Sequence, residues 1–189
     1  MLRRSILTAA TLAAATAPAF AHMNPAEHGS FMAGVSHPLF GADHILAMVA
    51  VGLWAALIGG RALWLVPSAF VGTMLVGFAL ALSGVSLPFV EPAILASVVA
   101  LGLLVALAVR LPTALSAVVV GLFALFHGYA HGGELGGAGA GSFAFGFALS
   151  TAVLHGLGLV LGRSLGGSGL LPRLLGGATA LGGLALMVG

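Results

Sequence analysis

The sequence predicts an all-α, polytopic integral membrane protein with about six transmembrane helices after a cleaved signal peptide. The chain is 60% hydrophobic and only 5% charged, it has no lysine, and its mean hydropathy is +1.21. Such a composition is typical of polytopic membrane proteins. A soluble domain of this length would need a charged surface, which four acidic residues and six arginines cannot supply. Because cysteine is absent, disulfides, thiolate metal sites and cysteine nucleophiles are excluded.

The first 21 residues are typical of a secretory signal peptide. Arg3 and Arg4 form a charged start, a short apolar stretch follows, and Ala19-Phe20-Ala21 matches an A-x-A cleavage site. The alternative is an uncleaved first membrane helix, but the apolar stretch is too short to span a bilayer comfortably. We therefore expect residues 1–21 to be removed and residues 22–189 to form a single transmembrane domain.

Six apolar segments follow, and each is close to the roughly 20 residues that cross a bilayer. A short polar lead at residues 22–36 precedes them. If residues 29–37 extend the first helix outward, Pro38 kinks that helix instead of starting it. The expected helices span about residues 38–59, 63–84, 88–109, 113–133, 141–162 and 170–188.

The distribution of arginine predicts the orientation of these helices. A cleaved signal places the mature N-terminus in the periplasm, so the connections after the first, third and fifth helices face the cytoplasm. All four arginines of the mature chain lie in or beside these connections, as the positive-inside rule requires. We therefore expect a multi-pass protein of the bacterial inner membrane. The four residues are Arg61, Arg110, Arg163 and Arg173.

The first of two polar stretches contains His37, Asp43 and His44. On one helix, His37 and His44 would be two turns apart and nearly on the same face. Asp43 could ligate a metal ion or accept the second ring N–H of a ligating histidine. Imidazoles and carboxylates in an apolar helix are costly and are rarely there without a function.

The second polar stretch contains His127, His131 and Glu134, which follow an i, i+4, i+7 pattern on one helix face. Two histidines at i and i+4 are a well-attested chelate, and a carboxylate one turn later is a natural further ligand. In the predicted topology both polar stretches lie in the outer half of the membrane. The two stretches together therefore predict a divalent-metal site near the periplasmic face.

Four more polar residues are candidates for additional metal contacts or for a pathway. Glu91, near the start of the third helix, is either such a ligand or a carboxylate favoured by the helix dipole. His155, nearer the midplane, is either a pathway ligand or a hydrogen-bonding partner of a neighbouring helix. His22 and His28 in the lead either capture metal or belong to a solvated tail.

Nitrogen and oxygen ligands without thiolate suit ions such as Ni²⁺, Co²⁺, Zn²⁺ or Mn²⁺. Two other functions use similar residues. A membrane-embedded zinc-dependent hydrolase would need an open coordination position and a substrate cleft, and the sequence has no HExxH or nucleophile motif. A bis-histidine haem electron carrier would need histidine pairs at matched depth, and the carboxylates beside these histidines argue against it.

The pairing of HPLFGADHILAMVAVGLWAA with FHGYAHGGE behind a signal peptide resembles the HupE/UreJ family of nickel/cobalt permeases. The resemblance covers essentially the whole chain. The family's two histidine patterns, and an acidic position in its third helix, fall on matching residues here. These are His37, Asp43 and His44 in the first pattern, Phe126, His127, His131 and Glu134 in the second, and Glu91 as the acidic position.

The resemblance implies a permease, not an enzyme, which imports Ni²⁺ or Co²⁺ for metalloenzymes such as hydrogenase or urease. It implies no permanent cofactor, with the metal ion and the lipid bilayer as partners, no nucleic acid, and a homo-oligomer left open. Because the sequence has no P-loop, we expect a facilitator or a secondary transporter. Some members carry a richer histidine cluster at the mature N-terminus, whereas this chain has only His22 and His28.

Overall fold

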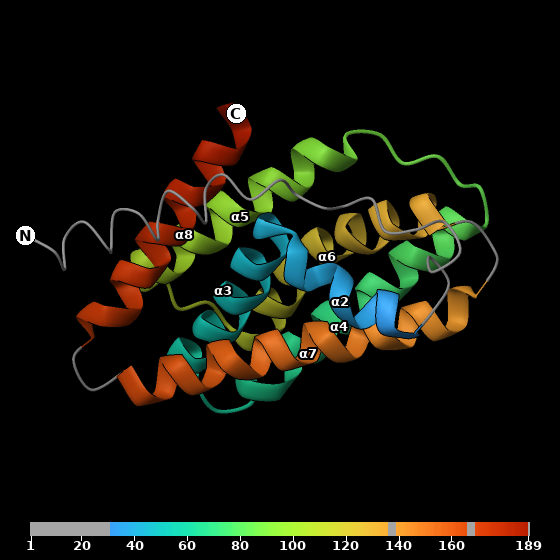
Figure 1. Cartoon of the computed structure of the whole chain (residues 1–189). Coiled ribbons are helices and arrows are strands. Elements are labelled where there is room, and N and C mark those ends of the chain that lie inside the picture. The colour runs from blue at the N-terminus through green and yellow to red at the C-terminus, as the bar shows by residue number, and fades with distance from the viewer. Residues whose placement is uncertain (1–30, 136–138, 166–168, 189) are drawn as a thin grey trace, which may run out of the picture.

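The computed structural model describes residues 31–135, 139–165 and 169–188. In these ranges the chain folds into seven α-helices and no strands, which confirms the all-α prediction (Figure 1). The predicted signal peptide and the histidines His22 and His28 lie outside the described residues. The helices are α2 (Phe31–Phe40), α3 (Ala42–Ile58), α4 (Ala62–Leu82), α5 (Val90–Ala106), α6 (Thr113–Leu135), α7 (Ala140–Leu165) and α8 (Leu170–Val188).

The helices of the described ranges have the length and composition of a polytopic membrane protein. Helices α4, α7 and α8, together with Thr113–Gly133 of α6, are each long and apolar enough to cross a bilayer. Helices α2 and α3 together form a fifth candidate, bent by 86°. Helix α5 is apolar but has only 17 residues. Length and composition therefore support four to five spans among the described residues, and a sixth depends on α5.

The first membrane segment differs most from the sequence prediction, because two helices replace the single helix expected at 38–59. Helix α2 begins inside the predicted polar lead, and Pro38 lies within it. The break falls at Gly41, whose backbone is extended (φ −89°, ψ 115°) and whose carbonyl accepts the Ile45 N–H at 3.1 Å. A Cβ on Gly41 would lie 2.8 Å from the Asp43 carboxylate, so a larger residue would crowd that side chain.

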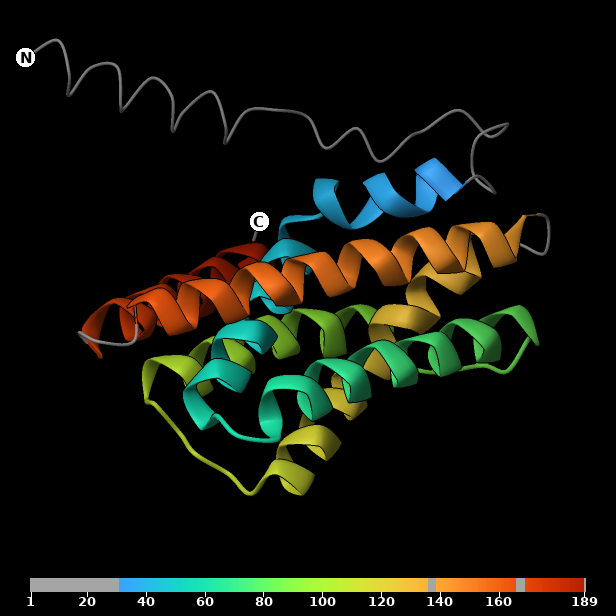
Figure 2. The same cartoon turned by 90° about the horizontal axis from the view of Figure 1, so that it is seen from below.

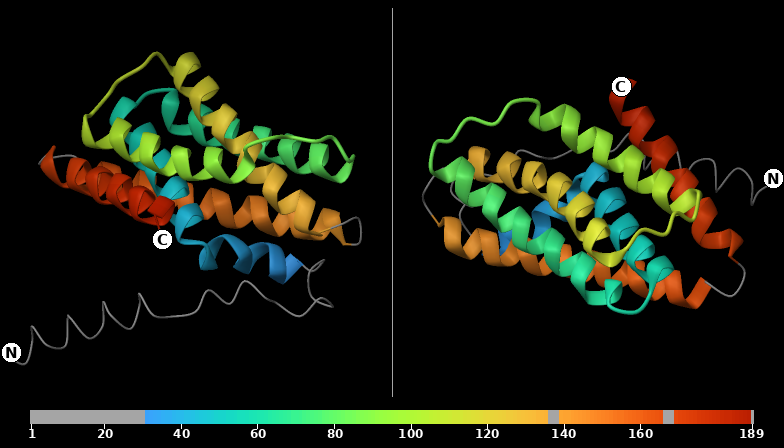
Figure 3. Two further views of the ribbon diagram at one scale, coloured as in Figure 1. Left: turned by 90° about the horizontal axis from the view of Figure 1, so that it is seen from above. Right: turned by 180° about the vertical axis from the view of Figure 1, so that it is seen from behind.

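The helices pack as neighbouring pairs that are distant in sequence. Helix α4 packs along α6, α5 along α8, and α7 packs against both α2 and α3 (Figures 1 and 2). The pairing of α5 with α8 is visible from behind in Figure 3. The buried core between them is apolar and aromatic, and Trp54 is fully buried with its indole N–H donated to the Val109 carbonyl at 2.8 Å.

Glycines allow all four of these pairs to touch backbone to backbone. A Cβ on Gly128 of α6 would overlap the carbonyl of Met74 on α4, and one on Gly77 of α4 would overlap the carbonyl of Leu125. Gly52 of α3 contacts the backbone of α7 in the same way. Small residues permit such close approach between membrane helices. Because Gly128 directly follows His127, this contact also fixes how deeply that imidazole lies in the bundle.

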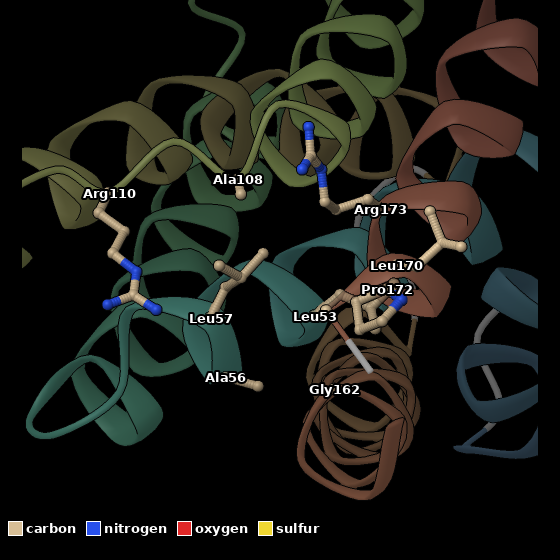
Figure 4. Close-up of a pocket in the computed structure, with 10 residues that line it drawn as sticks. Leu53, Ala56, Leu57, Ala108, Arg110, Gly162, Leu170, Pro172 and Arg173 are labelled. Carbon is tan, nitrogen blue, oxygen red and sulfur yellow. The ribbon is translucent and has the colours of Figure 1, made fainter. Parts of the chain in front are cut away.

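The arginines of the described residues gather at one end of the bundle, where α3, α5 and α7 finish and α4, α6 and α8 begin. Arg110 and Arg173 line a cavity of about 530 Å³ there, together with Leu57 and Gly162 (Figure 4). Arg173 donates its Nε–H to the Ala106 carbonyl at 2.8 Å. The predicted segregation of arginine is therefore present in the fold.

We expect Gly128→Ala to destabilise the bundle, because the new methyl group would overlap the Met74 carbonyl, which belongs to the backbone and cannot rotate away. The free energy of unfolding should fall by about 1–3 kcal/mol or more, as for other overpacked sites. Thermal unfolding of the purified protein in detergent measures it. Gly177→Ala in α8 is the matched control, because its Cβ would meet nothing within 4 Å. Equal midpoints for the two variants would contradict the proposed close contact.

Candidate metal site

Three imidazoles from helices α3 and α6 meet inside the bundle. His44 Nε2 lies 2.6 Å from His131 Nε2 and 3.2 Å from His127 Nδ1. All three side chains are buried, with at most 6% of each residue exposed. We call His44, His127 and His131 the imidazole cluster. It unites the two polar stretches that the sequence singles out, which are 83 residues apart or more.

The local structure of both stretches explains the meeting. His127 and His131 lie one turn apart on α6, as their spacing predicts, and both point to the same buried position. His44 lies in the first turn of α3, immediately after the break at Gly41. The break therefore directs the start of α3, and His44 with it, towards α6.

His37 reaches the cluster from a different helix. It lies on α2, and its ring centroid is 4.4 Å from that of His131 in an edge-to-face arrangement. Because α2 and α3 are separate helices, the two-turn spacing of His37 and His44 does not describe their geometry, and the expectation of a shared helix face is wrong. The 86° bend, not helical periodicity, brings His37 to the site.

Hydrogen bonds outside the cluster determine which nitrogens of His44 and His127 carry protons. His44 Nδ1 lies 3.1 Å from Asp43 Oδ2, so this nitrogen donates its N–H and Nε2 keeps a lone pair. Ser97 Oγ donates its only hydrogen to the Ile94 carbonyl at 2.6 Å, so it accepts from His127 Nε2 at 2.9 Å. His127 Nδ1 then keeps its lone pair. These protonation assignments follow from the hydrogen-bond network.

In the neutral rings, the two lone pairs point at each other. His44 Nε2 and His127 Nδ1 are 3.2 Å apart, and neither has a hydrogen to donate to the other. Two acceptors at this distance repel unless a cation lies beside both. Nitrogens bound to one ion at about 2.1 Å lie about 3.0–3.4 Å apart. The separation of these two nitrogens therefore suits a shared metal ion.

The cluster must widen slightly to surround an ion. Among the described residues, no group of three or more histidine, aspartate or glutamate side chains is already arranged to hold a metal. The shortest contact, 2.6 Å between His44 and His131, is a few tenths of an ångström below the spacing of two nitrogens on one ion. A small rotation of either ring would supply the difference.

Aromatic side chains enclose the cluster. The Phe147 ring centroid lies 4.7 Å from that of His131 and 6.2 Å from that of His44. Phe70 is fully buried on α4, and its ring centroid lies 5.7 Å from that of His127. These rings keep bulk water away from the nitrogens, and electrostatic interactions are stronger in such a low-dielectric site.

Of the remaining predicted site residues, Glu91 and His155 are not part of the cluster, and the side chain of Glu134 lies outside the described residues. Glu91 is exposed in the first turn of α5. His155 is buried on α7, and its ring centroid lies 5.1 Å from that of Phe70, which also contacts His127. Glu134 belongs to α6, but its side chain lies outside the described residues.

Sequence reasoning did not assign a role to Ser97, which the structure places against His127. The signal was present, because Ser97 interrupts an apolar helix and is completely buried. Its partner could not be identified, since a serine in a helix often bonds only to its own backbone. Here it does that and also accepts from the imidazole.

Comparison with known proteins agrees with these features. The family model described as "HupE / UreJ protein" matches residues 10–186. Protein HupE of Rhizobium leguminosarum bv. viciae is 49% identical over 183 residues, which cover 95% of this chain and 96% of that protein. No solved structure matches the chain. The chain therefore belongs to the HupE/UreJ family, a family of membrane transporters, not enzymes, associated with nickel and cobalt uptake.

Proposed function

We propose that this protein is an inner-membrane permease that imports Ni²⁺, with Co²⁺ as the alternative ion, and that the imidazole cluster is its outer binding site. The observation that carries the proposal is the 3.2 Å distance between His44 Nε2 and His127 Nδ1, the two nitrogens to which the hydrogen-bond network assigns lone pairs. His37 and Asp43 complete the site from α2 and α3. We also assign Glu134 to it, since it continues the helical pattern of His127 and His131.

The proposed mechanism is partial replacement of the ion's water shell by ring nitrogens. Neutral imidazoles suit Ni²⁺ and Co²⁺ better than harder ions such as Mg²⁺ or Ca²⁺. Asp43 holds the His44 ring in the ligating form and compensates part of the ion's charge. Binding must be favourable enough to admit the ion and weak enough to release it. The sequence has no ATP-binding P-loop, so we propose facilitated or secondary transport.

We also propose an orientation for the bundle. The arginine end would face the cytoplasm under the positive-inside rule, so the N-terminal side of α3 and the end of α6 would face the periplasm. Glu91, exposed at the start of α5, then lies on the periplasmic side, where a carboxylate would attract cations. The imported metal would serve metalloenzymes such as hydrogenase or urease. The hydrolase alternative is not favoured, because the family is one of transporters.

We expect His44→Ala to lower Ni²⁺ uptake at least about tenfold, because His44 contacts Asp43, His127 and His131 together. The measurement is radiotracer Ni²⁺ and Co²⁺ uptake in cells that lack other transporters for these ions. The variant should accumulate in the membrane normally. Ser83→Ala, an exposed serine at the end of α4, is the control and should transport normally.

Near-normal uptake by His44→Ala at limiting metal would contradict the assignment of the site. Failure of the unaltered protein to raise the uptake of either ion would contradict the proposed function itself. Equal uptake of Ni²⁺ and Co²⁺ would leave the permease intact and remove the proposed preference for Ni²⁺.

We expect Ser97→Ala to raise the Ni²⁺ concentration for half-maximal uptake about 10–100-fold, as is usual when the hydrogen-bond partner of a ligating histidine is lost. Without the hydroxyl, His127 Nε2 loses its acceptor, so the ring is no longer held with Nδ1 towards His44. Ser97→Thr keeps a hydroxyl that can bond to the backbone in the same way and should restore uptake. Unchanged uptake by Ser97→Ala would show that Ser97 does not position the ring.

A further inference from the structure

His155 is the buried polar group that the imidazole cluster leaves unexplained. It is 1% exposed, and neither of its ring nitrogens has a hydrogen-bond partner within the described part of the chain. Burying polar atoms without a partner is unfavourable, and a histidine in this condition costs stability that an apolar residue of similar size would not. The alternative expectation, that His155 hydrogen-bonds a neighbouring helix, is therefore not met among these residues.

The position of His155 relates it to the cluster. The Phe70 ring contacts two imidazoles, with its centroid 5.7 Å from that of His127 and 5.1 Å from that of His155. Along α7, His155 lies eight residues after Phe147, which corresponds to about 12 Å towards the arginine end. His155 is thus a further nitrogen donor towards the arginine end, and it contacts the same aromatic ring as the cluster does.

The surroundings of His155 leave room for a partly hydrated ion. The residue lines an open groove of about 440 Å³ between α4 and α7, with Pro67, Ser68 and Gly72 on the α4 side. One water molecule occupies about 30 Å³, so an ion with six waters needs about 200 Å³. A ring rotation would bring a nitrogen of His155 to this groove, where water could fill the other coordination positions.

We propose that His155 is a second, inward binding position for the transported divalent ion, which receives the ion after it leaves the imidazole cluster. This inference rests on the proposed function. A single protein nitrogen binds an ion more weakly than several imidazoles, so the ion would stay there only briefly. A weak second position lowers the barrier for inward passage without trapping the ion.

The first test compares uptake by His155→Leu with uptake by the unaltered protein. We expect the maximal rate to fall about tenfold while the concentration for half-maximal uptake stays within about twofold. Equilibrium binding of Ni²⁺ to the purified variant should be unchanged, because the cluster is intact. Since leucine removes two unpaired buried nitrogens, the variant should unfold at a temperature equal to or above that of the unaltered protein.

The second test uses the absence of cysteine from the chain. In His155→Cys the new thiol is the only sulfur able to bind as a thiolate, and cysteine also ligates Co²⁺ and Ni²⁺. We expect this variant to retain at least a third of the uptake and to show a sulfur-to-metal charge-transfer absorption with Co²⁺. Ser150→Cys places a buried cysteine on the same helix as the control and should show no such absorption.

Two results would overturn the inference while leaving the proposed function standing. One is a normal maximal rate in His155→Leu when His44→Ala has lost uptake. The other is absence of the charge-transfer absorption in a folded His155→Cys protein that still binds Co²⁺ at the cluster. If the unaltered protein imports neither Ni²⁺ nor Co²⁺, the proposed function fails first, and the inference about His155 fails with it.

Discussion

The opposition of two imidazole lone pairs in an apolar bundle is the interaction on which the site depends. His44 and His127 are each committed to one protonation form by a partner outside the cluster, Asp43 for one and Ser97 for the other. Asp43 lies on α3 and Ser97 lies on α5, so the two rings are fixed independently. Inside a low-dielectric bundle such a pair is unfavourable alone and becomes favourable with a cation. A bound cation would therefore stabilise this arrangement of the two rings.

The break at Gly41 is the backbone feature that makes this arrangement possible. A continuous helix from Phe31 to Ile58 would place His37 and His44 about 10.5 Å apart along one axis, too far apart for both to contact His131. The 86° bend lets α2 lie along α7 while α3 enters the bundle (Figure 2). Both histidines therefore reach His131. Glycine suits the break because a Cβ there would crowd the Asp43 carboxylate.

Much of this molecule could be predicted from the sequence, because apolar segments and i, i+4 spacing are local properties. Helices α6 and α8 begin where the sequence predicts, and His127 and His131 share a buried face as expected. The bend at Gly41 could not be predicted, since Pro38 offered an equally plausible break. The role of Ser97 and the isolation of His155 depend on contacts between helices, which a single sequence does not reveal.

The most direct test of the central claim is X-ray absorption spectroscopy of the purified full-length protein loaded with one equivalent of Ni²⁺. The account predicts a nitrogen and oxygen shell at about 2.1 Å that includes at least two imidazole rings, as judged by their outer-shell scattering. It also predicts one imidazole fewer in His127→Ala, since His127 Nδ1 faces His44 Nε2. A Ni²⁺ environment of water and carboxylate oxygens without imidazole, or a spectrum unchanged by His127→Ala, would contradict it.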